Sequence, residues 1–300
     1  MGDGPVLVLG ARGMLGADVM AALAAAGIPA FGLDLPEFDI TDEAALSAVL
    51  VGGPSGPISP ATKIGAEAPP TVAAVINCAA YTDVEGAEDH EALAHKVNCE
   101  AVGVLGSLAE ARGKYVIHIS MDFVFDGEKN GTYGEDDRPN PVSAYGRTKL
   151  AGEQALAASG CRHAVMRIQW TYGRSGSHFV SKIAGLSRGR DRIMVVDDQR
   201  AASTATTEVA EAILTLLRVQ VEGLYHFAAA GEASRFEVAQ AIVAGLGLST
   251  VVEPCGSDAF PAKARRPANS RFCCEKIEAL LGRAIRPRCV ALDEYLEEGA

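Results

Sequence analysis

Two hydrophobic patterns alternate along the first 170 residues of the chain. Short apolar runs have the length of buried strands, and between them apolar residues recur at the three- and four-residue spacing of a helix. Strands that alternate with helices in this way form a parallel sheet with helices on both faces, which is a doubly wound α/β fold. We expect strands over residues 5–10, 28–34, 72–80, 114–120 and 163–170, and helices over residues 14–27, 40–50, 87–113 and 143–160.

The pattern becomes less regular after residue 170. Helical spacing returns over residues 177–189, 206–220 and 234–247, and short apolar runs occupy residues 192–197 and 223–229. This mixture predicts a smaller C-terminal α/β domain. Residues 51–71 are rich in Gly, Pro and Ala and bury little, so we expect a surface loop there and assign it no function.

Composition and charge exclude several classes of function. The 300 residues carry a formal net charge of −11 and their basic residues are scattered, so we expect no nucleic-acid partner and no membrane partner. No apolar run has membrane-spanning length and no signal sequence opens the chain, which favours a cytoplasmic protein. The seven cysteines form no CxxC pair, so we expect free thiols and no metal site.

A glycine-rich turn, LGARGMLG, joins the first predicted strand to the first predicted helix. Gly10, Gly13 and Gly16 permit a tight bend and a close approach to a phosphate group, and the N-terminus of the helix then receives a pyrophosphate. The spacing alone is weak evidence in a chain with 32 glycines. The strand–turn–helix setting is the required context, and it predicts a dinucleotide cofactor.

The choice between the two nicotinamide cofactors stays open. Asp34 ends the second predicted strand, where an acid accepts hydrogen bonds from the adenosine ribose and favours NADH. Arg12 lies inside the glycine turn, where a guanidinium pairs with the 2′-phosphate of NADPH. Alternatively, Arg12 is solvated and Asp34 caps a turn.

Tyr145 and Lys149 lie one turn apart on one face of a predicted helix. Only about 0.2 such pairs are expected by chance, so the spacing by itself is modest evidence. A lysine ammonium one turn away, together with an oxidised nicotinamide, lowers the pKa of a phenol toward neutrality. We therefore expect Tyr145 to act as a general acid or base and Lys149 to hold the nicotinamide ribose.

Several motifs follow one another along essentially the whole chain. They are the glycine turn, NCAAYTDVEGAED, SMDFVFDG, PVSAYGRTKLAGE, RIQWTYG, VVDDQ and ARRPANS. In this order they resemble the extended short-chain dehydrogenase/reductase superfamily and, within it, the dTDP-4-dehydrorhamnose reductase family. The resemblance implies a Rossmann-type domain for NADPH or NADH over residues 1–170, joined by about 196–220, and a mainly substrate-binding domain over residues 171–300.

The resemblance also implies a reaction and a set of site residues. The reaction is reduction of the C4 ketone of a nucleotide-linked 4-keto-6-deoxy sugar, most simply dTDP-4-dehydro-L-rhamnose to dTDP-L-rhamnose, by an enzyme that is a possible homodimer. The catalytic positions are Tyr145, Lys149 and Met121. The cofactor positions are Gly10, Arg12, Gly13, Met14, Gly16, Asp34, Asp39, Ile40, Cys78, Ala79, Ala80, Tyr81, Asn98, Tyr145 and Lys149. The substrate positions are Thr82, Val84, Asp122, Phe123, Trp170, His178 and Gln199.

The substrate side departs from the family pattern. Met121 occupies a position where the family usually has a threonine whose hydroxyl bonds to the ketone oxygen, and a methionine donates no useful hydrogen bond. Loss of one such donor costs about 3–4 kcal/mol of transition-state stabilisation. His178 stands where asparagine is usual, Ala201 and Ser203 where glycine and proline are usual, and Arg235 where tryptophan is common.

Two hypotheses of function follow. The first is an active reductase for a nucleotide sugar, which the retained pair Tyr145 and Lys149 favours. The second is a cofactor-binding regulatory or scaffold protein on the same fold, similar to the β subunit of methionine adenosyltransferase. The substitution at Met121 favours this second hypothesis.

Overall fold

A six-stranded parallel sheet forms the centre of the computed structural model, which describes residues 4–51 and 72–299. The strand order is β10-β5-β4-β3-β1-β2, so the direction in which the chain adds strands reverses at β1. A crevice for ligands forms at such a point, beyond the carboxyl ends of the strands. The strands are β1 (Val6–Leu9), β2 (Ala30–Leu33), β3 (Ala74–Asn77), β4 (Tyr115–Met121), β5 (His163–Ile168) and β10 (Gly223–Phe227). The expected doubly wound α/β fold is confirmed.

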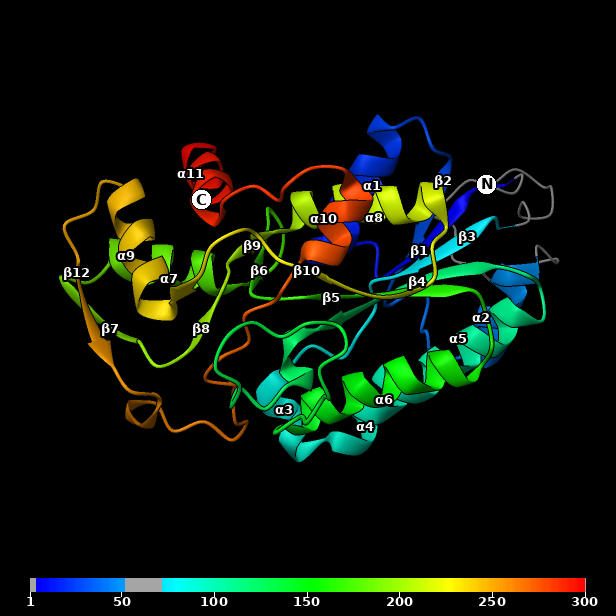
Figure 1. The fold of residues 1–300 in the computed structure, drawn as a ribbon, viewed down its shortest axis with the longest axis horizontal. Coiled ribbons are helices and arrows are strands. Elements are labelled where there is room, and N and C mark those ends of the chain that lie inside the picture. The colour runs from blue at the N-terminus through cyan, green and yellow to red at the C-terminus, as the bar shows by residue number, and fades with distance from the viewer. Residues whose placement is uncertain (1–3, 52–71, 300) are drawn as a thin grey trace.

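Helices cover both faces of this sheet (Figure 1). One face carries α1 (Met14–Ala25), α8 (Thr206–Val219) and α10 (Glu275–Leu281), and the other carries α2 (Glu43–Val51), α5 (Ala101–Glu110) and α6 (Ala144–Ala158). Each face has its own apolar cluster, which explains why the strands are nearly continuous apolar runs. No helix within residues 4–51 and 72–299 has the length and apolar character needed to cross a membrane.

The prediction of one helix over residues 87–113 is wrong. The segment divides into α3 (Val84–Asp89), α4 (Glu91–His95), a π-helical turn η1 (Lys96–Glu100) and α5. The first break is at His90, whose φ of −128° and ψ of 41° leave the helical region. The π-turn directs the buried Asn98 amide to the main chain of Tyr81, with distances of 2.9 Å and 3.2 Å. A side-chain contact between distant residues therefore overrides the helical spacing.

The remaining elements gather mainly beyond the carboxyl end of β5 (Figure 1). They are β6 (Thr171–Tyr172), α7 (Phe179–Arg188), β7 (Arg192–Val196), β8 (Arg200–Ala201), β9 (Thr204–Ala205), β11 (Ala233–Ser234), α9 (Arg235–Gly245), β12 (Val251–Cys255), α11 (Arg288–Glu297) and the 3-10 turns η2 (Asp122–Val124) and η3 (Ser257–Ala259). Helices α7, α9 and α11 share an apolar cluster with β7.

Several predicted elements of this part are confirmed, and the structure contains further elements that the sequence did not predict. The predicted helices correspond to α7, α8 and α9, and the predicted short strands to β7 and β10. Strand β12 and helices α10 and α11 were not predicted. Three elements after residue 170 belong to the central sheet and its cover: β10 is one of its strands, and α8 and α10 pack on one of its faces. The division into a cofactor domain and a substrate domain stays a prediction. Of the predicted loop over residues 51–71, Val51 is the last residue of α2 and the rest lies outside the described residues.

Candidate active site

A cavity of about 570 Å³ lies at the carboxyl ends of the central strands. It brings together the glycine turn after β1, the strand ends of β2, β3 and β4, and the start of α6. The predicted site residues that line it are Gly10, Gly13, Met14, Gly16, Asp34, Asp39, Ile40, Cys78, Ala79, Ala80, Thr82, Val84, Met121, Asp122, Phe123, Tyr145, Lys149 and Trp170. Candidate residues that are far apart in the sequence therefore share one cavity.

The glycine turn forms a cradle with little room for side chains. Gly10 has a φ of +73°, and a Cβ atom there would lie 2.7 Å from the backbone nitrogen of Ala79. Gly13 is the N-cap of α1 and offers no side chain to the amide groups of the first helical turn. Open amides at a helix N-terminus bind anions, so this cradle fits the pyrophosphate of a dinucleotide.

The acidic residue after β2 holds the glycine turn. One Asp34 carboxylate oxygen accepts a hydrogen bond from the Arg12 backbone nitrogen at 2.7 Å, and the other accepts one from Leu35 at 2.8 Å. The Arg12 guanidinium is exposed and pairs with Glu37, and it does not line the cavity. These contacts leave the choice between NADH and NADPH open.

Helix α6 carries the tyrosine and lysine into the cavity. Its N-cap Ser143 accepts a hydrogen bond from the Gly146 backbone nitrogen at 3.2 Å. A Cβ atom on Gly146 would lie 2.1 Å from the Phe123 carbonyl oxygen, so glycine permits close packing against the turn after β4. The Tyr145 ring packs edge-on against Phe123, and Lys149 donates a hydrogen bond to the Ile119 carbonyl at 2.7 Å. Both site residues are buried and tightly positioned.

The pKa of the Tyr145 phenol is raised in the chain on its own, and its lowering beside an oxidised nicotinamide stays a prediction. Burial raises the pKa of Tyr145, and the nearby carboxylate of Asp122 raises it further. Burial lowers the pKa of Lys149 to about 8, against the opposing charge of Glu153. The ammonium is engaged with the Ile119 carbonyl. The Tyr145 phenol is therefore protonated at neutral pH, which is the state that a proton donor needs.

Met121 lies at the cavity end of β4. It packs with Phe123 and Tyr145 in a small apolar cluster and lines the cavity. The preceding residue, Ser120, donates its hydroxyl hydrogen bond to the buried Glu153. Ser120 also lines the cavity, but its hydroxyl is engaged with this carboxylate.

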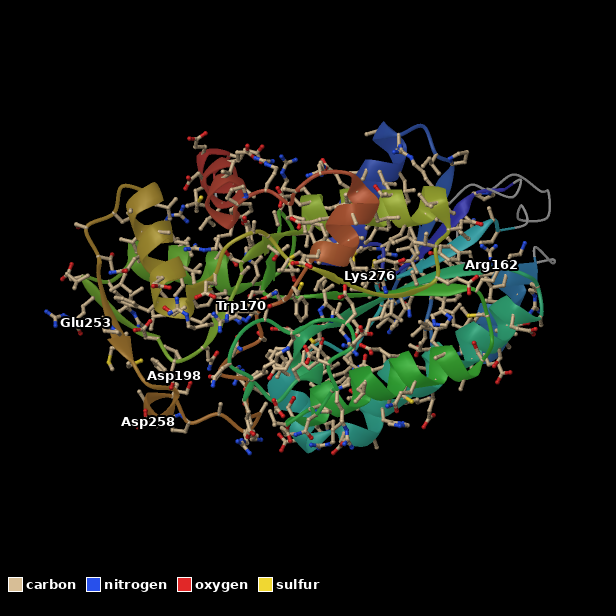
Figure 2. The ribbon with its side chains drawn as sticks, in the orientation of Figure 1. Arg162, Trp170, Asp198, Glu253, Asp258 and Lys276 are labelled. Atoms are coloured by element: carbon tan, nitrogen blue, oxygen red, sulfur yellow. The ribbon has the colours of Figure 1, made fainter. Side chains whose placement is uncertain are left out.

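Trp170 follows β5 in a backbone conformation that is uncommon for a bulky residue, with a φ of +42°. Figure 2 shows it between the central sheet and the group of helices α7 and α9. The Arg235 guanidinium carbon lies 3.6 Å from the centre of the Trp170 ring system and 4.7 Å from the centre of the Phe179 ring. Strained backbone is common at ligand-binding sites, so the strain at Trp170 and the stacked cation indicate that this edge of the cavity contacts a ligand.

A second cavity of about 950 Å³ adjoins the first, and Arg235 lines both. The predicted substrate residue Gln199 lines it and donates a hydrogen bond to the Ser257 hydroxyl at 3.0 Å. Its walls combine apolar side chains with charges of both signs, including Phe179, Phe260, Lys182, Arg265 and Arg266, and the carboxylates of Glu85 and Asp258. Figure 2 shows Asp198 and Asp258 near this part of the molecule.

Four predicted site residues line neither cavity: Arg12, Tyr81, Asn98 and His178. Asn98 braces the Tyr81 main chain through the two hydrogen bonds described above. His178 caps α7, accepting a hydrogen bond from the Ser181 backbone nitrogen at 3.3 Å. Within the described ranges, no group of three or more His, Cys, Asp or Glu residues is arranged to hold a metal ion.

Other cavity residues had no place in the sequence prediction. They are Leu9, Leu15, Leu33, Leu35, Phe38, Val97, Ile119, Ser120, Ile168, Gln169, Thr171, Gly176, Ser177 and Arg235. Most lie within a few residues of a predicted position, so extending each strand end would have found them. Arg235 comes from a distant helix, and its only signal was the departure from tryptophan.

Comparison with known proteins identifies the family. The family described as RmlD substrate binding domain matches residues 4–300. A dTDP-4-dehydrorhamnose reductase of Mycolicibacterium smegmatis is 39% identical over 267 residues, which cover 88% of this chain and 76% of the relative. The chain belongs to the dTDP-4-dehydrorhamnose reductase family.

Two solved structures of the dTDP-4-dehydrorhamnose reductase family extend the comparison. The structure from Clostridium acetobutylicum has a TM-score of 0.89 and 31% identity, covering 98% of each chain. The structure from Bacillus anthracis, solved in complex with NADP, has a TM-score of 0.88 and 28% identity, covering 99% of each chain. These relatives carry the names of reductases, so they favour an enzyme over a regulatory protein.

Proposed function

We propose that this chain uses NADPH or NADH to reduce the C4 ketone of dTDP-4-dehydro-L-rhamnose, giving dTDP-L-rhamnose. The observation that carries this proposal is one cavity lined by both the glycine turn and the Tyr145–Lys149 pair. Membership in the dTDP-4-dehydrorhamnose reductase family supports the same reaction. The B. anthracis relative in complex with NADP supports a nicotinamide cofactor.

Different cavity residues bind different parts of the cofactor. The turn at Gly10 and the amides of the first turn of α1 hold the pyrophosphate, and Asp34 lies where the adenosine ribose binds. Lys149 holds the nicotinamide ribose. A reduced nicotinamide supplies a hydride when it is bound there.

Tyr145 supplies the proton that the reaction consumes. Burial keeps its phenol protonated, and the phenol donates the proton to the oxygen at which negative charge develops. Transfer leaves a phenolate behind, and the Lys149 ammonium one turn away on α6 stabilises that charge. Met121 contributes shape but no hydrogen bond.

The second cavity is suited to the nucleotide part of the substrate. Lys182 and Arg265 provide positive charge for a diphosphate, whereas Arg266 is paired with Glu85, and Phe179 and Phe260 provide apolar surface for a base. A substrate with its nucleotide in this cavity extends its sugar toward Tyr145 in the first. This arrangement supports a nucleotide sugar.

Substrate-dependent oxidation of the cofactor tests the proposal. Purified protein, dTDP-4-dehydro-L-rhamnose and NADPH or NADH are mixed, and the loss of reduced-nicotinamide absorbance is followed. We expect dTDP-L-rhamnose in equal amount to the oxidised cofactor, identified by mass spectrometry and NMR. A protein that binds cofactor but turns over this substrate with neither nucleotide would overturn the substrate assignment.

A further inference from the structure

Arg235 is a partly buried cation that stacks on aromatic rings. It is the first residue of α9, whose N-cap Ser234 forms a reciprocal capping box with Glu237. The helix start is therefore held in place independently of the Arg235 side chain. The guanidinium lies over Trp170 and Phe179, at the distances given above.

The edges of this guanidinium have no partner among the residues that the structure describes. Within residues 4–51 and 72–299, no hydrogen bond or ion pair involves the Arg235 side chain, whereas Arg167 pairs with Glu153 and Arg266 pairs with Glu85. A stacked guanidinium uses its flat face, and its N–H donors project outward in the plane. Burial lowers the pKa of Arg235 to about 9, so the side chain is positively charged at neutral pH.

The position of Arg235 indicates what those donors meet. It lines both cavities, and the charges that act on it are Asp122 in the first and Arg266 in the second. A nucleotide sugar that spans the cavities must pass this residue. Its C4 ketone and its C1 phosphate lie at opposite ends of the sugar ring, so the phosphate attached to the sugar is the first charged group beyond the ring.

We propose that Arg235 binds the sugar-proximal phosphate of a nucleoside diphosphate sugar, through guanidinium N–H donors oriented by stacking on Trp170. This inference rests on the proposed function, which supplies the orientation of the substrate. A planar guanidinium matches the geometry of a phosphate, and charge-assisted hydrogen bonds are stronger than neutral ones. Arg235 is therefore a residue that selects ligands carrying the second phosphate.

Binding of two nucleotides to the protein loaded with NADP⁺ tests this inference. dTDP carries the sugar-proximal phosphate and dTMP lacks it. We expect Arg235→Gln to raise the Kd of dTDP about 10- to 100-fold, as for the loss of charge-assisted hydrogen bonds, and to leave the Kd of dTMP within about threefold. Calorimetry measures both constants without catalysis.

Two further variants make the result specific. Arg138→Gln removes a positive charge from an exposed position outside both cavities, and should change neither constant. Arg235→Lys keeps the charge and loses the planar fork, so the Kd of dTDP should rise by an intermediate factor. This variant also carries the test if Arg235→Gln does not fold, as judged by circular dichroism.

The remaining outcomes overturn one proposal or the other. Equal losses for dTDP and dTMP, or no loss for either, would show that Arg235 does not bind the second phosphate. A parent protein that binds neither nucleotide would instead refute the nucleotide-sugar substrate, and this inference with it. If the parent binds dTDP and the Arg235 variants bind it with the same Kd, the inference is refuted and the proposed function is not.

Discussion

Replacing Met121 with threonine should raise kcat/KM for dTDP-4-dehydro-L-rhamnose at least ~10-fold. Met121 lines the cavity beside Tyr145, and the neighbouring Ser120 hydroxyl is committed to Glu153. One hydrogen-bond donor to a developing oxyanion is worth about 10²–10³ in rate. Threonine is shorter than methionine, so we expect part of that gain, and a tenfold increase corresponds to about 1.4 kcal/mol.

A valine variant at the same position is the matched control. Threonine and valine have nearly the same shape, and both lose part of the apolar contact with Phe123 and Tyr145. That loss should lower the free energy of unfolding by about 1–2 kcal/mol in each variant, so it cancels in the comparison.

Initial rates of cofactor oxidation at saturating cofactor and low substrate give kcat/KM for the parent and both variants. We expect the order threonine variant, then parent, then valine variant. A threonine variant no faster than the valine variant would show that a hydroxyl at position 121 contributes nothing. In that case another group already stabilises the oxygen in the parent.

Three other changes test the site and its support. Tyr145→Phe should keep the Kd for cofactor and lose most turnover because the proton donor is removed; turnover within threefold of the parent would remove Tyr145 from the mechanism. Glu153→Gln should lower the free energy of unfolding by about 3–5 kcal/mol in urea titrations, since it leaves the Arg167 charge buried without its partner; a loss below about 1 kcal/mol would contradict this. Burial raises the pKa of Asp122 from 3.8 to about 6, so the native state binds this proton more tightly than the unfolded chain does. The free energy of unfolding should therefore fall as pH rises from about 4 to 6, and Asp122→Asn should reduce that slope. An identical slope in both proteins would show that the pKa of Asp122 is not raised in the native state.

The parts of the site that depend on local sequence were predictable. The glycine turn between a strand and a helix, and the pair Tyr145 and Lys149 on one helical face, are short-range patterns that the fold preserves. The small residues that follow β3 also line the cavity as predicted. Parallel strands end at one edge of a sheet, so locating the strands was enough to bring these segments together.

The parts that depend on contacts between distant residues were not predictable. The π-turn at Asn98 follows from a hydrogen bond to the main chain of Tyr81, which helical spacing does not encode. The raised pKa of Tyr145 depends on complete burial, which no nearest-neighbour pattern reveals. Arg235 lies over Trp170 only in the folded chain, where the start of α9 meets a residue 65 positions earlier in the sequence.

Transfer of deuterium from a labelled cofactor tests the central claim most directly. The protein is given dTDP-4-dehydro-L-rhamnose and NADPH or NADH that carries deuterium at nicotinamide C4, and the sugar product is examined by NMR and mass spectrometry. The proposed reaction predicts dTDP-L-rhamnose with one deuterium at sugar C4, and almost no product from the Tyr145→Phe variant. A product without deuterium, or with deuterium at another carbon, would contradict direct reduction of the C4 ketone in this cavity.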